Sequence, residues 1–383
     1  MEEEKKTSKS DIASDKTKWK ETPYLMIKGF LMGSADIVPG VSGGTLALIT
    51  GIYNRLINAI RSLDVPAIKD LFSFRFTAFF SRVHWKFLLI LLSGAVLAVI
   101  FFTRVVPLQV YMFTHPEIVY GLFFGLILGS VFLLITEIKQ EDHGWLMMIP
   151  VIAGTLFGFW VVNLVPADTP ETFFFVFVSG SVAICAMILP GISGSYILLI
   201  FRKYDYILAQ LGNIGSAETT TALLNLLPFI LGAVIGLAFF SRVLSWLLKH
   251  FHATTLLVLI GFLIGSLYII WPYQEREYTE RVREVQELPL DDPLVQQLID
   301  REEIPGTPTY QRVDVVPLPE EDDPSRLVRV ETISRKMISS EPFNPWAKGD
   351  ELRDDVNVWS GLQGMGIGLF MIIGIAYLRK RTY

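Results

Sequence analysis

The chain contains the stretch Pro39-Gly40-Val41-Ser42-Gly43-Gly44-Thr45 inside an apolar segment at 22–61, and a close copy, Pro190-Gly191-Ile192-Ser193-Gly194-Ser195, inside another at 173–201. A Pro-Gly pair followed by a further glycine ends a helix, because proline lacks an amide hydrogen and glycine favours turns. Each remaining half-helix has about 10 to 15 residues, or ~15–22 Å, which is too short to cross ~30 Å of hydrocarbon. We therefore predict two re-entrant hairpins of the form helix–break–helix, each entering and leaving a membrane on one side.

The similarity between the two segments continues along the chain, which predicts an internal repeat. Three spans are expected between the hairpins, and an odd number of crossings inverts the second copy relative to the first. Inverted repeats with broken helices are typical of secondary transporters; the alternative is a duplicated scaffold that no longer transports. The further ordered matches are Tyr53 with Tyr204, Gly94-Ala95-Val96 with Gly232-Ala233-Val234, Phe101–Val105 with Phe239–Val243, and Gly125–Ser130 with Gly261–Ser266.

Charge is distributed unevenly along the chain. Of its 383 residues, 51% are hydrophobic and 19% are charged, whereas about 25% of residues are charged in an ordinary soluble domain. Residues 272–358 hold 21 Asp or Glu and 11 Lys or Arg, a net charge of −10, and the rest of the chain has a net charge of +5. The chain therefore combines an acidic soluble segment with a basic, apolar body that we predict to be integral to a membrane.

Six further stretches are apolar and long enough to cross a bilayer as helices. Lys and Arg flank the first hairpin on both sides and follow the last span, which places both termini in the cytoplasm by the positive-inside rule. The acidic segment 272–358 then lies on the extracytoplasmic side; the loop that carries Arg202 and Lys203 runs against the rule. We expect an all-α polytopic membrane protein with inverted repeats and a small extracytoplasmic insertion. The six spans are 87–106, 117–136, 145–165, 222–246, 253–271 and 359–378.

These expectations divide the chain into six parts. The insertion contains the strand-like stretch 327–332 and scattered prolines, so a small β-containing domain and partial disorder both stay open. The parts are a basic cytoplasmic tail at 1–21, a first membrane repeat with its hairpin at 22–140, a linking transmembrane helix at 141–172, a second repeat with its hairpin at 173–271, the insertion at 272–358, and a final transmembrane helix with a basic cytoplasmic tail at 359–383.

The break motifs have the chemistry of an anion site. Glycines let a ligand approach the backbone, each second half-helix begins with unpaired N–H groups and a positive dipole end, and serine and threonine add hydroxyls. Two such ends converging from opposite sides favour a phosphate group; the alternative is that small residues only permit tight helix packing. The candidate substrate-binding residues of the motifs are Gly40, Ser42, Gly43, Gly44, Thr45, Gly191, Ser193, Gly194 and Ser195.

Two acidic residues are candidates for coupling transport to a proton or a sodium ion. Asp36 lies one short turn before the first break and has Met187 as its counterpart in the repeat, so symmetry does not require an acid there. A carboxylate at membrane depth is costly and usually functional, although a capping role competes at this position. Glu137 closes a predicted span, where it is either interfacial or part of the coupling site.

Four arginines are candidates for contact with an anionic substrate. Arg104 and Arg242 occupy equivalent positions in the two repeats, where they bind phosphate oxygens or extend to the lipid headgroups. Arg55 and Arg202 follow the two hairpins and either attract an anionic headgroup or serve as solvated flanking charge.

Several function classes find little support in the residues. Gly40-x-Ser42-x-Gly44 fits a nucleophile-elbow pattern, but that motif requires a strand–turn–helix context, and serine hydrolysis within a membrane requires a nearby histidine. The five histidines flank the apolar runs without metal-ligand spacing, and Cys185 is the single cysteine. No phosphate-loop motif and no interleaving of aromatic and basic residues are present. We therefore expect no enzymatic activity, no cofactor, no bound metal and no nucleic-acid partner.

The motifs resemble those of the PopT-type bacterial family, formerly a family of unknown function and now associated with undecaprenyl-phosphate translocation. The resemblance rests on Lys28-Gly29-Phe30, on the run from Asp36 to Thr45, on the run from Met187 to Ser195, and on Gly261–Ser266 with Trp271-Pro272. It covers most of 25–272 and the last span, while the acidic insertion departs from it.

The resemblance implies a flippase that returns undecaprenyl phosphate from the outer to the inner leaflet of the bacterial cytoplasmic membrane. The lipid is then reused in cell-wall peptidoglycan and glycan synthesis. The residues alone favour a transporter with an anion site, and only the resemblance names the lipid. A secondary transporter of a small anion, an intramembrane lipid-phosphate hydrolase and a scaffold built on the outer segment remain alternatives, and the driving ion and a homo-oligomeric state stay open.

Overall fold

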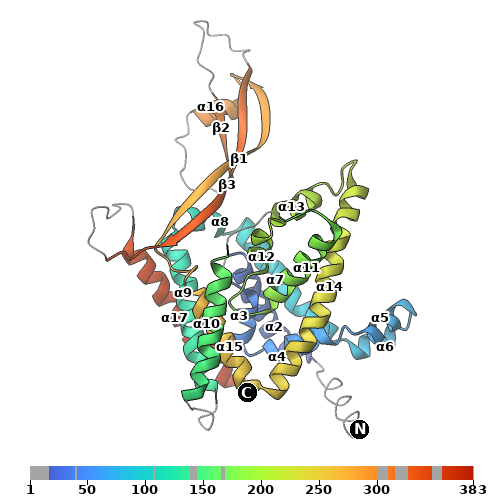
Figure 1. Ribbon diagram of the computed structural model, residues 1–383. Helices are drawn as coiled ribbons and strands as arrows, with labels where there is room; N and C mark the ends of the chain where they lie inside the picture. The colour runs from blue at the N-terminus through green and yellow to red at the C-terminus, as the bar shows by residue number, and fades with distance from the viewer. Residues whose placement is uncertain are drawn as a thin grey trace.

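The computed structural model consists of a body of packed helices from which a narrow sheet projects (Figure 1). Four of its described helices are long and apolar enough to cross a membrane: α7 (Trp85–Arg104), α9 (Pro116–Glu137), α14 (Thr219–His250) and α17 (Val358–Thr382). Three shorter apolar helices are α10 (Met148–Val162), α11 (Phe173–Ile188) and α15 (His252–Ser266). The chain is a membrane protein with a mostly helical body. The structure describes residues 17–38, 41–106, 108–138, 145–164, 169–299, 309–314, 327–346 and 356–382.

Four of the six predicted spans coincide with the long helices α7, α9, α14 and α17. The stretches predicted at 145–165 and 253–271 instead form α10 and α15, each of 15 residues. Helices of this length rise about 22 Å, less than the ~30 Å of a hydrocarbon core. The reason is local, because Asn163 ends α10 and a turn at 267–270 follows α15.

The two motif-bearing segments contain the same order of elements. In the first, α2 (Thr22–Asp36) ends before the break, and α3 (Gly43–Ile49) and α4 (Tyr53–Arg61) follow. In the second, α11 is followed by α12 (Gly194–Ile200) and α13 (Tyr204–Gly212). The turn after each short helix contains a residue with positive φ, 72° at Gly51 and 50° at Arg202. The inverted, re-entrant arrangement relative to a membrane stays a prediction.

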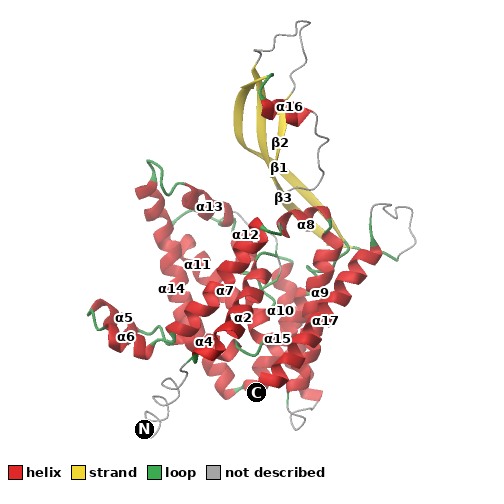
Figure 2. Cartoon of the chain, turned by 180° about the vertical axis from the view of Figure 1, so that it is seen from behind, coloured by secondary structure: helices red, strands yellow, loops and turns green. Residues whose placement is uncertain are grey.

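Small residues bring the long helices together in pairs. A methyl group added at Gly29 of α2 would overlap the Leu91 carbonyl of α7, and one added at Gly232 of α14 would overlap the Phe177 carbonyl of α11. Glycine at such positions lets two backbones approach closely, which is how helices associate in lipid. The remaining pairs are α9 with α17 and α10 with α15, which lie side by side in Figures 1 and 2.

Short helices precede or connect the longer ones. They are η1 (Trp19–Glu21), α5 (Val65–Phe72), α6 (Phe76–Arg82), α8 (Leu108–Thr114) and η3 (Trp145–Met147). In Figure 1, α5 and α6 extend sideways from the helical body, at the end opposite the sheet.

The insertion folds as an antiparallel sheet in its described part, so the all-α prediction applies to the helical body only. Strand β3 (Leu327–Pro342) lies between β1 (Gln274–Pro289) and β2 (Thr309–Asp314). The 16 residues of β1 span about 53 Å when extended, and the ribbon leads away from the helices (Figure 2). A small apolar cluster under α16 (Pro293–Ile299) stabilises its far end; its buried members are Val295, Val328 and Val330.

Candidate substrate site at the paired motifs

The first motif contacts the break of the second motif directly. The Ser42 hydroxyl lies 3.3 Å from the backbone oxygens of both Met187 and Leu189 and donates to this pair. The N–H group of Gly191 donates a 3.1 Å hydrogen bond to Oγ1 of Thr45. Residues 145 to 147 positions apart in the chain are thereby joined. The structure thus brings Ser42, Thr45 and Gly191 together at one place.

Burial and close approach explain the residue types at this junction. All seven residues of α3 are buried, and buried hydroxyl groups normally have hydrogen-bond partners. A Cβ atom at Gly44 would lie 2.6 Å from the Ile188 carbonyl oxygen, and the hydroxyl of Tyr53 donates to the same carbonyl at 3.2 Å. Gly191 has a φ of +81°, a conformation that favours glycine. The tight-packing explanation therefore applies to these glycines, and a role in substrate binding stays a prediction.

The start of α3 is already occupied by groups of the protein. Oδ1 of Asp36 accepts a 2.6 Å hydrogen bond from the Gly43 N–H group, and Oγ of Ser42 accepts one from Gly44 at 3.1 Å. The Asp36 side chain remains accessible at the surface. A carboxylate at a helix N-terminus is stabilised by the positive end of the helix dipole. The capping role of Asp36 is therefore observed, and its ion-coupling role stays a prediction.

The start of α12 differs from that of α3 although the motifs are similar. Ser193 is the N-cap residue of α12, and its side chain makes no capping hydrogen bond. Its Oγ atom lies 2.9 Å from that of Ser195, which is exposed. Gly194 is buried, and a Cβ atom there would lie 2.6 Å from the Ala183 carbonyl oxygen of α11. Met187 stands where the first motif has its carboxylate, so the second motif itself provides hydroxyl groups and no acid at the start of α12.

The paired arginines lie on exposed helix surfaces. Arg104 is the last residue of α7 and is exposed. Arg242 is also exposed and donates from Nη1 to the Ala238 carbonyl one turn earlier on α14. Within the described part of the chain, no hydrogen bond joins either arginine to the motif residues. Their contact with phosphate or headgroups stays a prediction.

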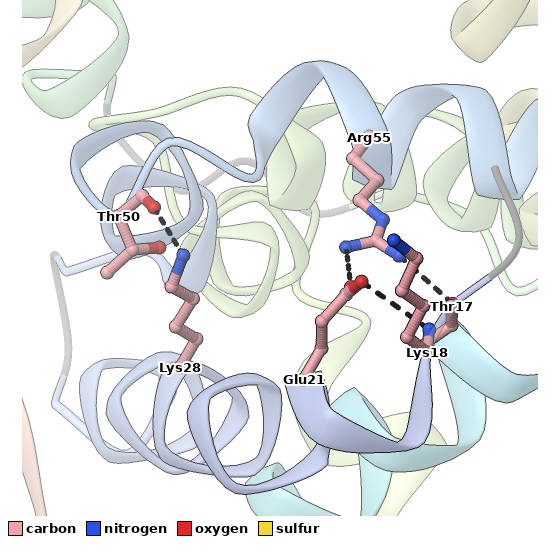
Figure 3. A network of polar contacts seen from close by, with 6 residues as sticks. All are labelled: Thr17, Lys18, Glu21, Lys28, Thr50 and Arg55. Atoms are coloured by element: carbon pink, nitrogen blue, oxygen red, sulfur yellow. Dashed lines mark hydrogen bonds and ion pairs between the residues drawn. The ribbon is translucent and has the colours of Figure 1, made fainter. Parts of the chain in front are cut away.

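Arg55 is held by protein groups rather than free in solvent. Its Nη1 lies 2.8 Å from Oε2 of Glu21, and its Nη2 donates to Oγ1 of Thr17 at 3.0 Å (Figure 3). Its guanidinium carbon also lies 4.7 Å from the centre of the Phe87 ring. These contacts hold α4 against Thr17 and η1, and attraction of a headgroup by Arg55 stays a prediction.

Two lysines of the basic flanks bind backbone carbonyls near the short helices. Lys28 donates to the Thr50 carbonyl at the end of α3, at 2.9 Å (Figure 3). Lys203 is 1% exposed, and its Nζ donates to the Thr169 carbonyl at 2.6 Å. Its neighbour Arg202 is exposed. Apart from the basic residues that flank the two hairpins, the sequence gives no indication of these hydrogen bonds, because the acceptors are backbone atoms from other parts of the chain.

Two of the predicted site residues lie wholly or partly outside the described part of the chain. Gly40 lies outside the described residues, and Glu137 is the last residue of α9 with a side chain that is likewise outside them. Among the described residues, no group of three or more His, Cys, Asp or Glu side chains is placed to hold a metal ion.

The packed apolar helices and the joined breaks define a polytopic membrane protein with two linked motif segments. The chain belongs to the undecaprenyl phosphate translocase-like family, VCA0040-like, whose profile matches residues 32–287. This range includes both motifs and most of β1.

Two relatives carry the same name, polyprenyl-phosphate transporter. The protein of Vibrio cholerae serotype O1 is 40% identical over 249 residues, covering 65% of this chain and 77% of the relative. That of Staphylococcus aureus is 32% identical over 259 residues, covering 64% of this chain and 85% of the relative. No solved structure matches the chain.

Proposed function

We propose that this protein is a flippase for undecaprenyl phosphate in the bacterial cytoplasmic membrane, returning the lipid from the outer to the inner leaflet for reuse. The family and the names of two relatives support a polyprenyl-phosphate substrate. The observation that carries the proposal is the uncapped start of α12 beside a break that the first motif holds in place.

In this proposal the phosphate headgroup binds at the start of α12 and the polyprenyl tail stays in lipid. Ser193 and Ser195 supply hydroxyl groups, and Gly194 lets the start of α12 pack closely against the Ala183 carbonyl of α11. Ser42, Thr45 and Gly191 are committed to bonds within the protein, so their role is to fix the position of this helix end. Arg104 and Arg242 meet the headgroup before and after it reaches the break.

Asp36 gives the proposal a route to proton coupling. Its carboxylate accepts a hydrogen bond from the Gly43 N–H group, and its negative charge repels a phosphate that enters the break. Protonation removes that charge and weakens the bond to Gly43, so a proton and a headgroup bind together more readily than either alone. Sodium bound to the carboxylate is the alternative coupling ion, and Glu137 is the second candidate residue.

The proposed topology follows from inverted repeats. The segments α2–α4 and α11–α13 are re-entrant from opposite sides, both termini are cytoplasmic, and the sheet is extracytoplasmic. The basic flanks of the first segment and the basic C-terminus support this orientation.

The test measures leaflet exposure of a fluorescent polyprenyl phosphate in liposomes containing the purified protein. We expect faster loss of outer-leaflet signal than in empty liposomes. Replacing Ser193 and Ser195 together with alanine removes two hydroxyl contacts, each worth about 1 kcal/mol, so we expect a rate reduced about 10-fold or more. Ser81→Ala is the control, since its hydroxyl is exposed and donates to the Ala78 carbonyl of its own helix.

Two results would count against the proposal. Equal rates of lipid movement with and without protein would exclude flippase activity. An unchanged rate in the double alanine variant would exclude Ser193 and Ser195 as binding residues. Uptake of inorganic phosphate without lipid movement would instead identify a small-anion transporter.

A further inference from the structure

An arginine at the base of the sheet contacts the helical body. Arg276, the third residue of β1, places its guanidinium carbon 4.1 Å from the centre of the Tyr120 ring on α9. Tyr120 is 5% exposed. The contact lies where the sheet joins the helices, because Tyr273 binds the Val358 carbonyl at the start of α17 at 2.7 Å.

Two nitrogens of this guanidinium have no acceptor. Nε and Nη2 of Arg276 are buried and make no hydrogen bond to any described residue. Buried donors of a charged group are rarely left unpaired, because their desolvation is then uncompensated. Other arginines of the sheet behave differently: Arg312 pairs with Glu331 at 3.2 Å, and Arg335 pairs with Glu280 at 3.1 Å.

The acidic insertion does not neutralise Arg276 in the described part of the chain. The strand register places Arg276 opposite Ser340, which carries no charge. Its neighbours Glu275 and Glu277 are exposed, and alternation along a strand directs them to the opposite face from Arg276. Among the described residues, the half-buried Arg276 guanidinium therefore forms no ion pair with the acids of the sheet.

We propose that Arg276, stacked on Tyr120, forms a receiving site for a phosphate monoester group at the base of the sheet. Nε and Nη2 lie on one edge of the guanidinium, where their N–H bonds run parallel and match two oxygens of one phosphate. The aromatic ring holds the guanidinium plane in position. The ligand is a lipid headgroup or free phosphate. The lipid version rests on the proposed function and makes this site the point where the headgroup enters.

The test measures binding to the full-length protein in phosphatidylcholine nanodiscs. The probes are farnesyl phosphate, farnesol and inorganic phosphate, and the readouts are the dissociation constant and the ligand-induced shift in unfolding temperature. We expect Arg276→Gln to weaken farnesyl phosphate binding at least 10-fold, and farnesol not to bind detectably. Arg312→Gln is the matched control, since this arginine of the same sheet is exposed and paired, and we expect wild-type affinity.

Unchanged affinity of the Arg276→Gln variant for both phosphate probes would overturn the inference. If that variant does not fold, Arg276→Lys replaces it, because lysine keeps the positive charge but lacks two parallel N–H donors. We expect the affinity of Arg276→Lys for farnesyl phosphate to fall about 3-fold or more. Wild-type affinity of this variant would overturn the inference. Arginine-dependent binding of farnesyl phosphate alone identifies a lipid headgroup, and equal binding of inorganic phosphate identifies the free ion. Binding of a phosphate probe that depends on Arg276, in a protein that does not transport lipid, would exclude the proposed function but support this site.

Discussion

The N–H group of Gly191 donates a hydrogen bond to the hydroxyl of Thr45, at 3.1 Å and across 146 positions of the chain. Gly191 lies in the second break and Thr45 in the short helix that follows the first. Because both residues are buried, this bond does not compete with water, and each motif depends on the other for its conformation.

We expect Thr45→Val to lower the free energy of unfolding by about 1–3 kcal/mol, because the valine leaves the buried Gly191 N–H group without an acceptor. Thermal or denaturant unfolding in detergent measures the change. Thr45→Ser keeps the hydroxyl and serves as the control, with a smaller loss from the missing methyl group. Equal stability of the valine variant and the wild type would contradict the role of this bond.

We expect Gly44→Ala to destabilise the protein by about 1–3 kcal/mol, because the added methyl group meets the Ile188 carbonyl and forces the breaks apart. Unfolding experiments measure the effect, and lipid transport should fall with it. Gly366→Ala is the matched control, since a Cβ atom there meets nothing within 4 Å. Similar stability of both variants would show that the breaks tolerate separation.

We expect Tyr53→Phe to cost about 1 kcal/mol, because it removes the donor to the Ile188 carbonyl and leaves the ring in place. Tyr204 is the counterpart of Tyr53 in the repeat, and no described hydrogen bond involves its hydroxyl. Tyr204→Phe should therefore leave stability within about 0.5 kcal/mol of the wild type. Comparing the unfolding curves of the two variants checks this difference between the repeats. A larger loss of stability in Tyr204→Phe than in Tyr53→Phe would refute it.

We expect lipid transport to slow as the pH rises, because the charged Asp36 carboxylate holds the Gly43 N–H group and repels phosphate. Asp36→Asn keeps an acceptor for Gly43 and removes the charge, so its transport rate should no longer depend on pH through this residue. Transport measured over a pH series checks this. Asp70→Asn is the control, since Asp70 lies outside the motifs and pairs with Arg82 at 3.6 Å. A wild-type pH profile in Asp36→Asn would exclude Asp36 as the coupling residue.

The sequence predicted the helical elements better than their lengths. Proline and glycine at the breaks predicted where α2 and α11 end, because helix termination depends on neighbouring residues. The apolar stretch at 253–271 suggested a full span, yet α15 ends at Ser266. Hydrophobicity alone does not distinguish a span from a shorter helix followed by an apolar turn, and the last residue of that turn, Ile270, is fully buried.

The sequence predicted which residues make up the candidate site, but not how the two motifs differ in their roles. The two motifs read alike, and both suggested an open helix start. The structure shows that Asp36 and Ser42 occupy the start of α3, whereas Ser193 leaves that of α12 uncapped. The signal was present, because Met187 replaces the acid in the second copy, but its consequence depends on the path of the hairpin.

The sequence by itself determined that this chain is a membrane protein with two broken apolar segments, because helix propensity, helix termination and hydrophobicity are properties of neighbouring residues. Only the tertiary structure decided that Ser42 donates to carbonyls of the second break and that Arg276 of the sheet stacks on Tyr120. Such contacts join residues more than a hundred positions apart, and they depend on how close-packed helices bring backbones together rather than on any local preference.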